Sequence, residues 1–198
     1  MDIRISKKNV KLGNIWNLNL PPKNVCQEKP CYKEGCCYNA KAWRQYPSVR
    51  ISWKKNWDSL QESSDVFFET IINKIKRSYK KPYFFRWHAA GEIPTQEYLE
   101  GMKKASLTFP EIKFLVYTKQ YFLTFENIPS NLQIIISAWP NLDISDYLLE
   151  NFPIAWMLDG RETRHESRKT FKCPGKCSKC KICWKLGKIK KDVCFTRH

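Results

Sequence analysis

The stretch Leu-Gln-Ile-Ile-Ile-Ser-Ala at residues 132–138 is the clearest strand in the chain, and it decides the fold class. Its three consecutive isoleucines leave little polar alternation, which is typical of a strand buried on both faces of a sheet. Two other apolar runs have the same character, Ile-Lys-Phe-Leu-Val-Tyr at residues 112–117 and Pro-Ile-Ala-Trp-Met-Leu at residues 153–158. We therefore expect a largely parallel sheet that is covered on both sides.

Helical patterns separate the predicted strands. Further strands are expected at residues 15–20 and 83–89, and helices at residues 59–80, 95–107 and 143–149. The first of these helices has Ser59 as a candidate N-cap, with Glu62 three residues later. Alternation of strand and helix implies parallel pairing through right-handed crossovers. We expect an α/β fold of about four to six strands, arranged either as an open parallel sheet or as a partial barrel, because the chain is too short for a complete eight-fold barrel.

Composition suggests one core with an appended segment. The chain has 198 residues, of which 42% are hydrophobic, enough for a single sizeable core. After residue 160 the sequence becomes basic, polar and rich in cysteine. We expect an α/β core over residues 1–160 and a cluster-binding extension over residues 161–198 that packs against it.

The sequence also indicates the compartment in which the protein is located. No apolar run approaches the roughly 20 residues of a membrane helix, so no membrane partner is expected. The opening MDIRISKKNVKLGN is polar and basic, without the apolar region of a secretory signal. These features predict a cytoplasmic protein.

The charge is positive and uneven. The chain has 35 Lys and Arg against 19 Asp and Glu, a net charge of +16, and residues 161–198 hold 13 of the basic and 3 of the acidic residues. Nucleic acid is the expected partner of this basic C-terminal region, because neutralised phosphates supply most non-specific affinity. The alternatives are a solvated tail and charge that offsets anionic metal–thiolate groups.

Nine cysteines lie in two clusters at opposite ends of the chain. The proximal cluster is Cys26, Cys31, Cys36 and Cys37, and the distal cluster is Cys173, Cys177, Cys180, Cys183 and Cys194. Closely spaced cysteines in a chain without a secretory signal indicate metal ligands more than disulfides.

The spacing in the distal cluster favours iron and sulfide over zinc. Its first four cysteines fall within a single run, Cys-Pro-Gly-Lys-Cys-Ser-Lys-Cys-Lys-Ile-Cys at residues 173–183. Four thiolates suit either a tetrahedral zinc ion or a [4Fe–4S] cluster. Zinc ribbons separate their two cysteine pairs by about a dozen residues or more, whereas one compact run is closer to a ferredoxin loop. Cys194 is either a substitute ligand or spare.

The proximal cluster predicts a metal site with an open position. Neighbouring residues rarely direct both side chains at one metal, so we expect only one of Cys36 and Cys37 to be a ligand. Three protein ligands and an open position are typical of a reactive site, whereas four make a closed structural one. The alternative is a zinc site shared with the distal cluster, since loops from opposite chain ends often meet in compact domains.

The layout of the first half of the chain resembles the radical S-adenosylmethionine enzymes. Their CxxxCxxC loop follows the first strand and holds a [4Fe–4S] cluster, and a GGE-like turn after the second strand receives the amino group of the cofactor. The resemblance implies that Cys26, Cys31 and one of Cys36 and Cys37 hold a cluster, and that Glu92 faces the methionyl ammonium. The cysteine spacings here are four and then four or five residues, and Ala90 replaces the first glycine.

A second resemblance spans most of the chain, to the phage family called gene product 88. Its motifs appear in order: Cys37-Tyr38, an Arg-x-His-x-x-Gly-acidic stretch at residues 86–92, Tyr-Thr-Lys at residues 117–119, Ser137 ending a strand, and the cysteine run closed by Trp184. The resemblance implies a phage-type protein, located in the host cytoplasm if a phage encodes it. It implies no reaction.

Four polar residues are candidates for a cofactor-binding pocket: Arg86, His88, Glu92 and Lys119. Arg86 and His88 alternate with Trp87 and so share one face of their strand. Glu92 and Lys119 follow the ends of strands, where sites form in parallel sheets. The structural alternative is that Arg86 pairs with an acid such as Glu92, while His88 satisfies a buried hydrogen bond.

The leading hypothesis is an iron–sulfur protein on a radical-S-adenosylmethionine-like scaffold, with one or two [4Fe–4S] clusters and a surface for nucleic acid. The first alternative is a zinc-stabilised module that binds nucleic acid without catalysis. The second is an active radical enzyme that binds S-adenosylmethionine.

Overall fold

A computed structural model describes residues 1–8, 11–139, 143–158 and 169–196. Its centre is one eight-stranded sheet in the order β1-β2-β3-β4-β5-β6-β8-β7. The strands are β1 (Ile5–Ser6), β2 (Trp16–Leu18), β3 (Phe84–Trp87), β4 (Lys113–Thr118), β5 (Leu132–Ser137), β6 (Ile154–Leu158), β7 (Thr170–Lys172) and β8 (Asp192–Thr196). Only the pair β1–β2 is antiparallel. The sheet is open, which confirms the open parallel sheet rather than the partial barrel. It has eight strands, so the expected four to six strands are too few, because β1, β7 and β8 also join it.

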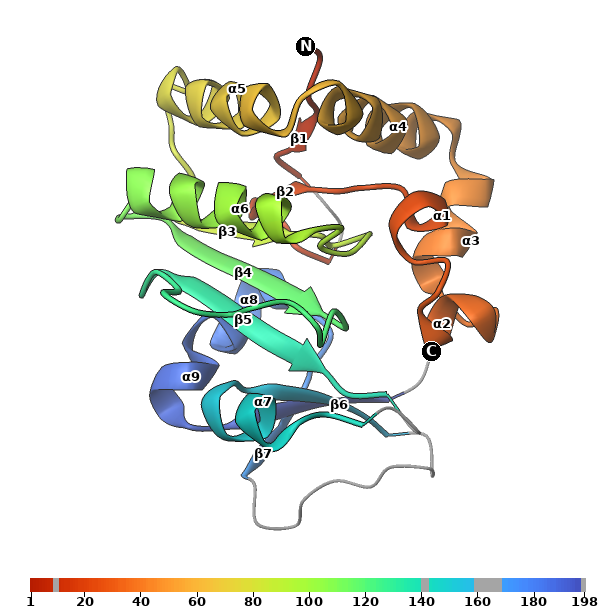
Figure 1. The fold of residues 1–198 in the computed structure, drawn as a ribbon, viewed down its shortest axis with the longest axis vertical. Coiled ribbons are helices and arrows are strands. Elements are labelled where there is room, and N and C mark those ends of the chain that lie inside the picture. The colour runs from red at the N-terminus through yellow and green to blue at the C-terminus, as the bar shows by residue number, and fades with distance from the viewer. Residues whose placement is uncertain (9–10, 140–142, 159–168, 197–198) are drawn as a thin grey trace.

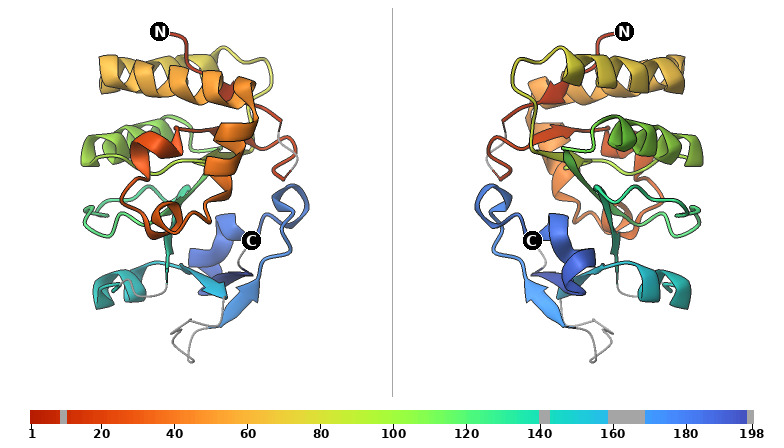
Figure 2. Two further views of the ribbon diagram at one scale, coloured as in Figure 1. Left: turned by 90° about the vertical axis from the view of Figure 1, so that its right-hand side faces the viewer. Right: turned by 90° about the vertical axis from the view of Figure 1, so that its left-hand side faces the viewer.

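Helices of very different length surround the sheet (Figure 1). They are α1 (Pro22–Val25), α2 (Pro30–Lys33), α3 (Tyr38–Gln45), α4 (Pro47–Glu62), α5 (Ser64–Lys76), α6 (Gln96–Thr108), α7 (Asp146–Asn151), α8 (Cys177–Cys180), the 3-10 helix η1 (Ile182–Lys185) and α9 (Leu186–Ile189). Figure 2 shows α6 and α7 on one side of the sheet and α8 and α9 on the other. The expected α/β architecture with both faces covered is therefore confirmed.

The two faces of the sheet are packed by different parts of the chain. Phe85, Trp87, Phe114 and Ile134 project into the larger core, together with apolar residues of α5, α6 and α7. Alternate strand residues such as Leu115 project into a smaller core built with η1 and α9. Burial of apolar surface on both faces is what makes these strands read as continuous apolar runs.

The predicted helix over residues 59–80 is wrong in its boundaries. Residues Pro47–Glu62 form α4, so Ser59 and Glu62 lie inside a helix that began twelve residues earlier. The chain breaks at Ser63, which has extended backbone and caps α5 by accepting a 3.3 Å hydrogen bond from the amide of Val66. Ser59 and Ser63 lie four residues apart, and from the sequence alone either serine is a suitable N-cap.

The predicted boundary at residue 160 does not separate a core from an extension. Strand β8 lies between β6 and β7 in the same sheet, so residues 170–196 supply two of its strands. The buried carboxylate of Asp192 fastens this connection, since it accepts 2.9 Å hydrogen bonds from the amide of Ile154 and from Nε1 of Trp156. This part of the chain is integral to the fold.

Within the described residues, no helix combines the length and the apolar character needed to cross a bilayer.

Candidate metal centre

A cavity of about 220 Å³ lies at the carboxyl ends of β3, β4, β5, β6 and β8. The four predicted pocket residues all line it: Arg86, His88, Glu92 and Lys119. Its far wall comes from the segment around α1, α2 and α3, which Figure 1 shows beside the arrow tips of β4 and β5. The cavity therefore occupies the edge at which parallel sheets place their sites.

Cysteines from both ends of the chain meet at this cavity. All four members of the proximal cluster line it, together with Cys173, Cys177 and Cys183 of the distal cluster. The proximal cluster follows β2, and the distal residues follow β7, whose partner β8 pairs with β6. The topology of the sheet thus brings two segments distant in sequence to one site.

Within the proximal cluster, three thiols interact with one another and the fourth bonds to a backbone carbonyl. Cys31 hydrogen-bonds to Cys37, which raises the pKa of Cys31 and lowers that of Cys37 to about 7. Burial raises the pKa of Cys26 to about 12, with further contributions from Glu92 and Cys31. The Sγ atom of Cys36 instead lies 3.5 Å from the backbone carbonyl of Cys31. The structure therefore distinguishes Cys36 from its neighbour.

The distal cluster wraps around a short helical segment. Cys177 begins α8 and Cys180 ends it, Lys181 then adopts the left-handed conformation at φ 55°, and Cys183 follows in η1. Burial raises the pKa of Cys183 to about 11, and its thiol also interacts with the hydroxyl of Tyr117. Burial likewise raises the pKa of Cys173. The positions of Cys177, Cys180 and Cys183 are therefore set by one short helical turn and the left-handed residue that follows it.

Cys194 is placed differently from the other distal cysteines. It belongs to the larger apolar core, whereas its neighbours Val193 and Phe195 face the smaller core on the opposite side of β8. Cys194 does not line the cavity.

The donors fit a sulfur-ligated metal in chemistry, although not as a closed cage. Thiolates are the ligands of zinc and of iron–sulfur clusters. In the described part of the chain, no group of three or more His, Cys, Asp or Glu side chains is already arranged around a single metal position. Metal binding at these cysteines would therefore draw the ligands together.

Arg86 and His88 are buried in this cavity without the partners expected for them. The guanidinium of Arg86 lies over the ring of Tyr117, 4.9 Å from its centroid, and makes no ion pair with any described carboxylate, including Glu92. His88 has left-handed backbone at φ 54°. Both of its ring nitrogens are buried and unpaired among the described residues, and burial and the charge of Arg86 lower its pKa to about 3.

Glu92 closes the cavity between the ends of two strands. One carboxylate oxygen accepts a hydrogen bond from the amide of Ile93 at 2.9 Å, and the other from the amide of Lys119 at 2.8 Å. The preceding Gly91 has φ 100°, and an added Cβ would lie 2.8 Å from the carbonyl oxygen of Leu20. Glycine is required there for close approach of two backbones.

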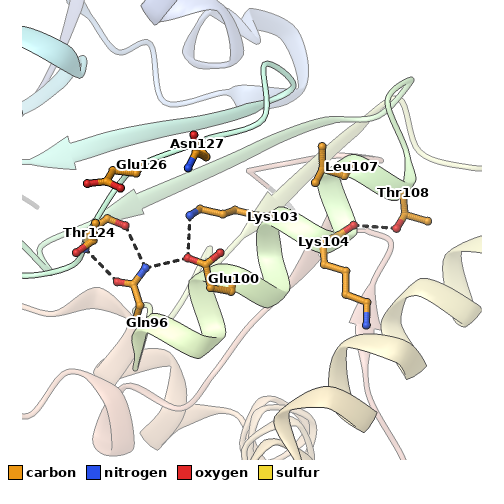
Figure 3. A pocket seen from close by; sticks show the side chains of 9 residues that line it. All are labelled: Gln96, Glu100, Lys103, Lys104, Leu107, Thr108, Thr124, Glu126 and Asn127. Carbon is orange, nitrogen blue, oxygen red and sulfur yellow. Dashed lines mark hydrogen bonds and ion pairs between the residues drawn. The ribbon is translucent and has the colours of Figure 1, made fainter.

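A second hollow lies on the outer side of α6, and Figure 3 shows why it is not a candidate. Gln96 exchanges hydrogen bonds with the backbone of Thr124 and donates to Glu100, while Lys103 pairs with Glu100 at 2.8 Å. Gln96, Glu100 and Lys103 are thus joined to one another, whereas no bond connects the side chains of Lys104, Glu126 and Asn127 to the other residues drawn.

The chain matches the family described as Gene product 88 over residues 3–186. It belongs to this family. The match confirms the phage-type resemblance and includes the proximal cluster and the run of four distal cysteines, whereas Cys194 lies beyond it. No curated protein and no solved structure matches the chain.

Proposed function

We propose that this member of the Gene product 88 family is an iron–sulfur protein, with metal held by cysteines of both clusters at the cavity. Cys26, Cys31 and Cys37 would form one ligand set, and Cys173, Cys177, Cys180 and Cys183 the other; of these seven, Cys180 does not line the cavity. The observation that carries the proposal is the meeting of the two clusters at one cavity. Scattered core cysteines would have no reason to converge on the edge where parallel sheets place their sites.

A bound [4Fe–4S] cluster would supply one-electron chemistry, or an iron open to a ligand where only three cysteines bind it. The residues around the proximal cluster define what could reach it. His88 is neutral at physiological pH because of its low pKa, and Glu92 is anchored by two backbone amides. Glu92 is thus anchored at the cavity wall, which suits a site that orients a ligand.

The test of metal identity is anaerobic purification under iron-replete conditions. We expect a brown protein with broad absorption near about 400 nm and with iron and acid-labile sulfide. Replacing Cys177 and Cys180 together by Ser should remove the distal metal and destabilise the fold, because metal binding contributes directly to folding free energy. Stoichiometric zinc without sulfide would overturn the proposal in favour of the zinc-stabilised module.

The radical-S-adenosylmethionine-like scaffold is the finer part of this proposal. In its support, β2, β3, β4, β5 and β6 are adjacent in sequence order, the proximal cluster follows β2, and the Gly91-Glu92 turn follows β3. Adding S-adenosylmethionine to the reduced protein tests it by electron paramagnetic resonance. A perturbed cluster signal, reduced in Glu92→Ala, would support an active radical enzyme. A spectrum unchanged at millimolar cofactor would eliminate that enzyme.

A second candidate function is nucleic-acid binding, which is favoured by one surface with an exposed tyrosine among lysines. Tyr83 is 59% exposed, lies 5.0 Å from the ammonium of Lys113 by its ring centroid, and is within electrostatic range of Lys185 and Lys188. The three lysines lie at the start of β4, in η1 and in α9. An exposed aromatic ring among lysines is suited to stacking of unpaired bases.

Salt-dependent binding tests this surface. The triple change of Lys185, Lys188 and Lys190 to Ala should weaken binding to single-stranded DNA and reduce the slope of log affinity against log salt. Tyr83→Ala should weaken binding with the slope unchanged, whereas Tyr83→Phe should retain it. Binding that is absent at low salt would leave the lysines as a solvated surface.

A further inference from the structure

Arg86 is a buried cation that forms no ion pair with a carboxylate in the described part of the chain. Burial lowers its pKa, but Tyr38, Tyr117, Cys177 and Cys183 raise it by more. Its side chain makes no hydrogen bond to a described residue, its Nε atom has no contact with solvent, and the residue is only 9% exposed. An isolated buried charge is costly, and a protein retains one where something compensates for it. Tyr117 offers the face of its ring, but a ring face offsets only part of that cost.

The surroundings of Arg86 add positive charge. The basic residues that line the cavity are Lys11, Lys29, Arg86 and Lys119. Among the described lining residues, Glu92 is the only acidic one, and its carboxylate already accepts hydrogen bonds from two backbone amides. A concave site with this balance attracts small anions.

His88 supplies unused hydrogen-bonding capacity beside this charge. Its neutral ring has one donor and one acceptor nitrogen, and neither has a partner among the described residues. A buried polar group of this kind requires an explanation in a native structure. The ring packs against Tyr98, with the two ring centroids 5.3 Å apart, so a ligand would accept a hydrogen bond from the donor nitrogen after the ring rotates toward the cavity.

Part of the remaining wall is apolar, which restricts the ligand further. Carbon-rich side chains line the cavity beside Arg86, among them Ala138, Ala155, Met157 and Phe195. The volume of about 220 Å³ is below that of pockets for drug-sized molecules. The ligand therefore has an anionic end and a small apolar part.

We propose that this cavity binds a small organic molecule through a carboxylate or phosphate group received by Arg86, with His88 as a second hydrogen-bonding partner. Arginine presents a planar fork that matches either oxyanion. Cysteines of the proposed metal site line the same cavity, so anion binding is measured on metal-free and on metal-loaded protein. If the counter-ion of Arg86 were instead the thiolates of Cys177 and Cys183, no added anion would be bound.

Thermal unfolding with matched probes tests the proposal. Benzoate and phenyl phosphate present the two oxyanions on the same ring, and benzamide is the neutral control. We expect one or both anions to raise the unfolding temperature of the wild type in a concentration-dependent manner, and benzamide to leave it unchanged. The anion with the larger effect identifies the oxyanion class.

Variants at Arg86 identify the contact. In Arg86→Gln the affinity for the effective anion should fall by roughly tenfold or more, whereas Lys104→Gln, which removes a charge from the exposed side of α6, should leave it unchanged. Arg86→Lys keeps the charge without the fork and should also bind more weakly.

Three results would overturn the proposal. They are equal stabilisation of wild type and Arg86→Gln by the anions, wild-type affinity in Arg86→Lys, and absence of anion stabilisation in both metal-free and metal-loaded wild type. Metal content is measured on the same samples, so a failure of the anion site is distinguished from a failure of the iron–sulfur proposal.

Discussion

The backbone amide of Lys119 donates a 2.8 Å hydrogen bond to the carboxylate of Glu92, and this bond joins the end of β4 to the turn after β3. The other carboxylate oxygen accepts from the amide of Ile93, and Glu92 is only 4% exposed. A single buried side chain thus satisfies two backbone donors at the rim of the cavity. Its removal would leave both backbone donors without their partner.

Glu92→Ala should therefore lower the free energy of unfolding by about 2–4 kcal/mol, because two charge-assisted hydrogen bonds are lost. Glu92→Gln should cost less, since the amide oxygen still accepts one of them. Urea unfolding monitored by tryptophan fluorescence measures both values. Glu126→Ala, at an exposed position, is the control and should change stability by no more than about 0.5 kcal/mol. Wild-type stability in Glu92→Ala would contradict this role.

The cysteines should differ in what their replacement does to bound metal. Cys37 interacts with Cys31 through its thiol, whereas Cys36 turns its Sγ toward a backbone carbonyl. Cys37→Ser should therefore abolish metal at the proximal cluster, and Cys36→Ser should retain it. Metal and sulfide analysis of the purified variants measures this.

Cys194→Ala provides the matched control for these replacements. Because Cys194 packs in the larger core, its replacement should lower stability by the modest amount expected for a small buried side chain, without loss of metal. Equal metal loss from Cys36→Ser and Cys37→Ser, or metal loss from Cys194→Ala, would contradict the assignment.

The central strands could be predicted because each is a short apolar run between polar segments. Residues 112–117, 132–138 and 153–158 differ from β4, β5 and β6 by at most one residue at each end. The same reasoning placed Arg86, His88, Glu92 and Lys119 at strand ends, and they do line one cavity. Local pattern suffices where burial on both faces dictates the residue type.

The remaining features depend on contacts between distant residues. Strand β8 has only a short apolar run after a series of lysines, and its place between β6 and β7 depends on the bonds of Asp192 to β6. The meeting of the two cysteine clusters follows from that placement. The opposite orientation of Cys194 follows from strand alternation, which could be applied only once β8 was known to be a strand.

Gly101 provides a test of helix packing in which two effects have opposite signs. It lies in the middle of α6, where alanine is favoured over glycine by about 1 kcal/mol. A Cβ at this position would lie 2.1 Å from the ring of Phe68 in α5, and overpacking of a core typically costs about 1–3 kcal/mol. The ring is fully buried, so the steric term should dominate.

Gly101→Ala should accordingly be less stable than the wild type in urea unfolding, despite its better helix propensity. Combining it with Phe68→Leu should recover part of the loss relative to Phe68→Leu alone, because the smaller side chain makes room. Stabilisation by Gly101→Ala in the wild-type background would show that α5 and α6 are not packed at this distance.

His88 should make the stability of the metal-free protein depend on pH in a defined direction. Burial, followed by the charge of Arg86, lowers its pKa to about 3 from the ordinary 6.5. Below about pH 6.5, His88 is therefore protonated in the unfolded chain but stays neutral in the folded protein until the pH approaches 3. Stability falls as the pH is lowered from 6.5 toward 3. Between pH 7 and pH 5 the loss should be about 2 kcal/mol from this residue.

The variant His88→Asn, whose side chain tolerates the left-handed backbone, should lack this loss. Between pH 7 and pH 5, the unfolding free energy of the variant relative to that of the wild type should therefore rise by the same amount. Urea unfolding at the two pH values measures it, and other titrating groups cancel in the difference. Parallel pH dependence in the two proteins, or titration of the His88 ring near pH 6.5 by nuclear magnetic resonance, would mean that the imidazole is protonated in the folded state.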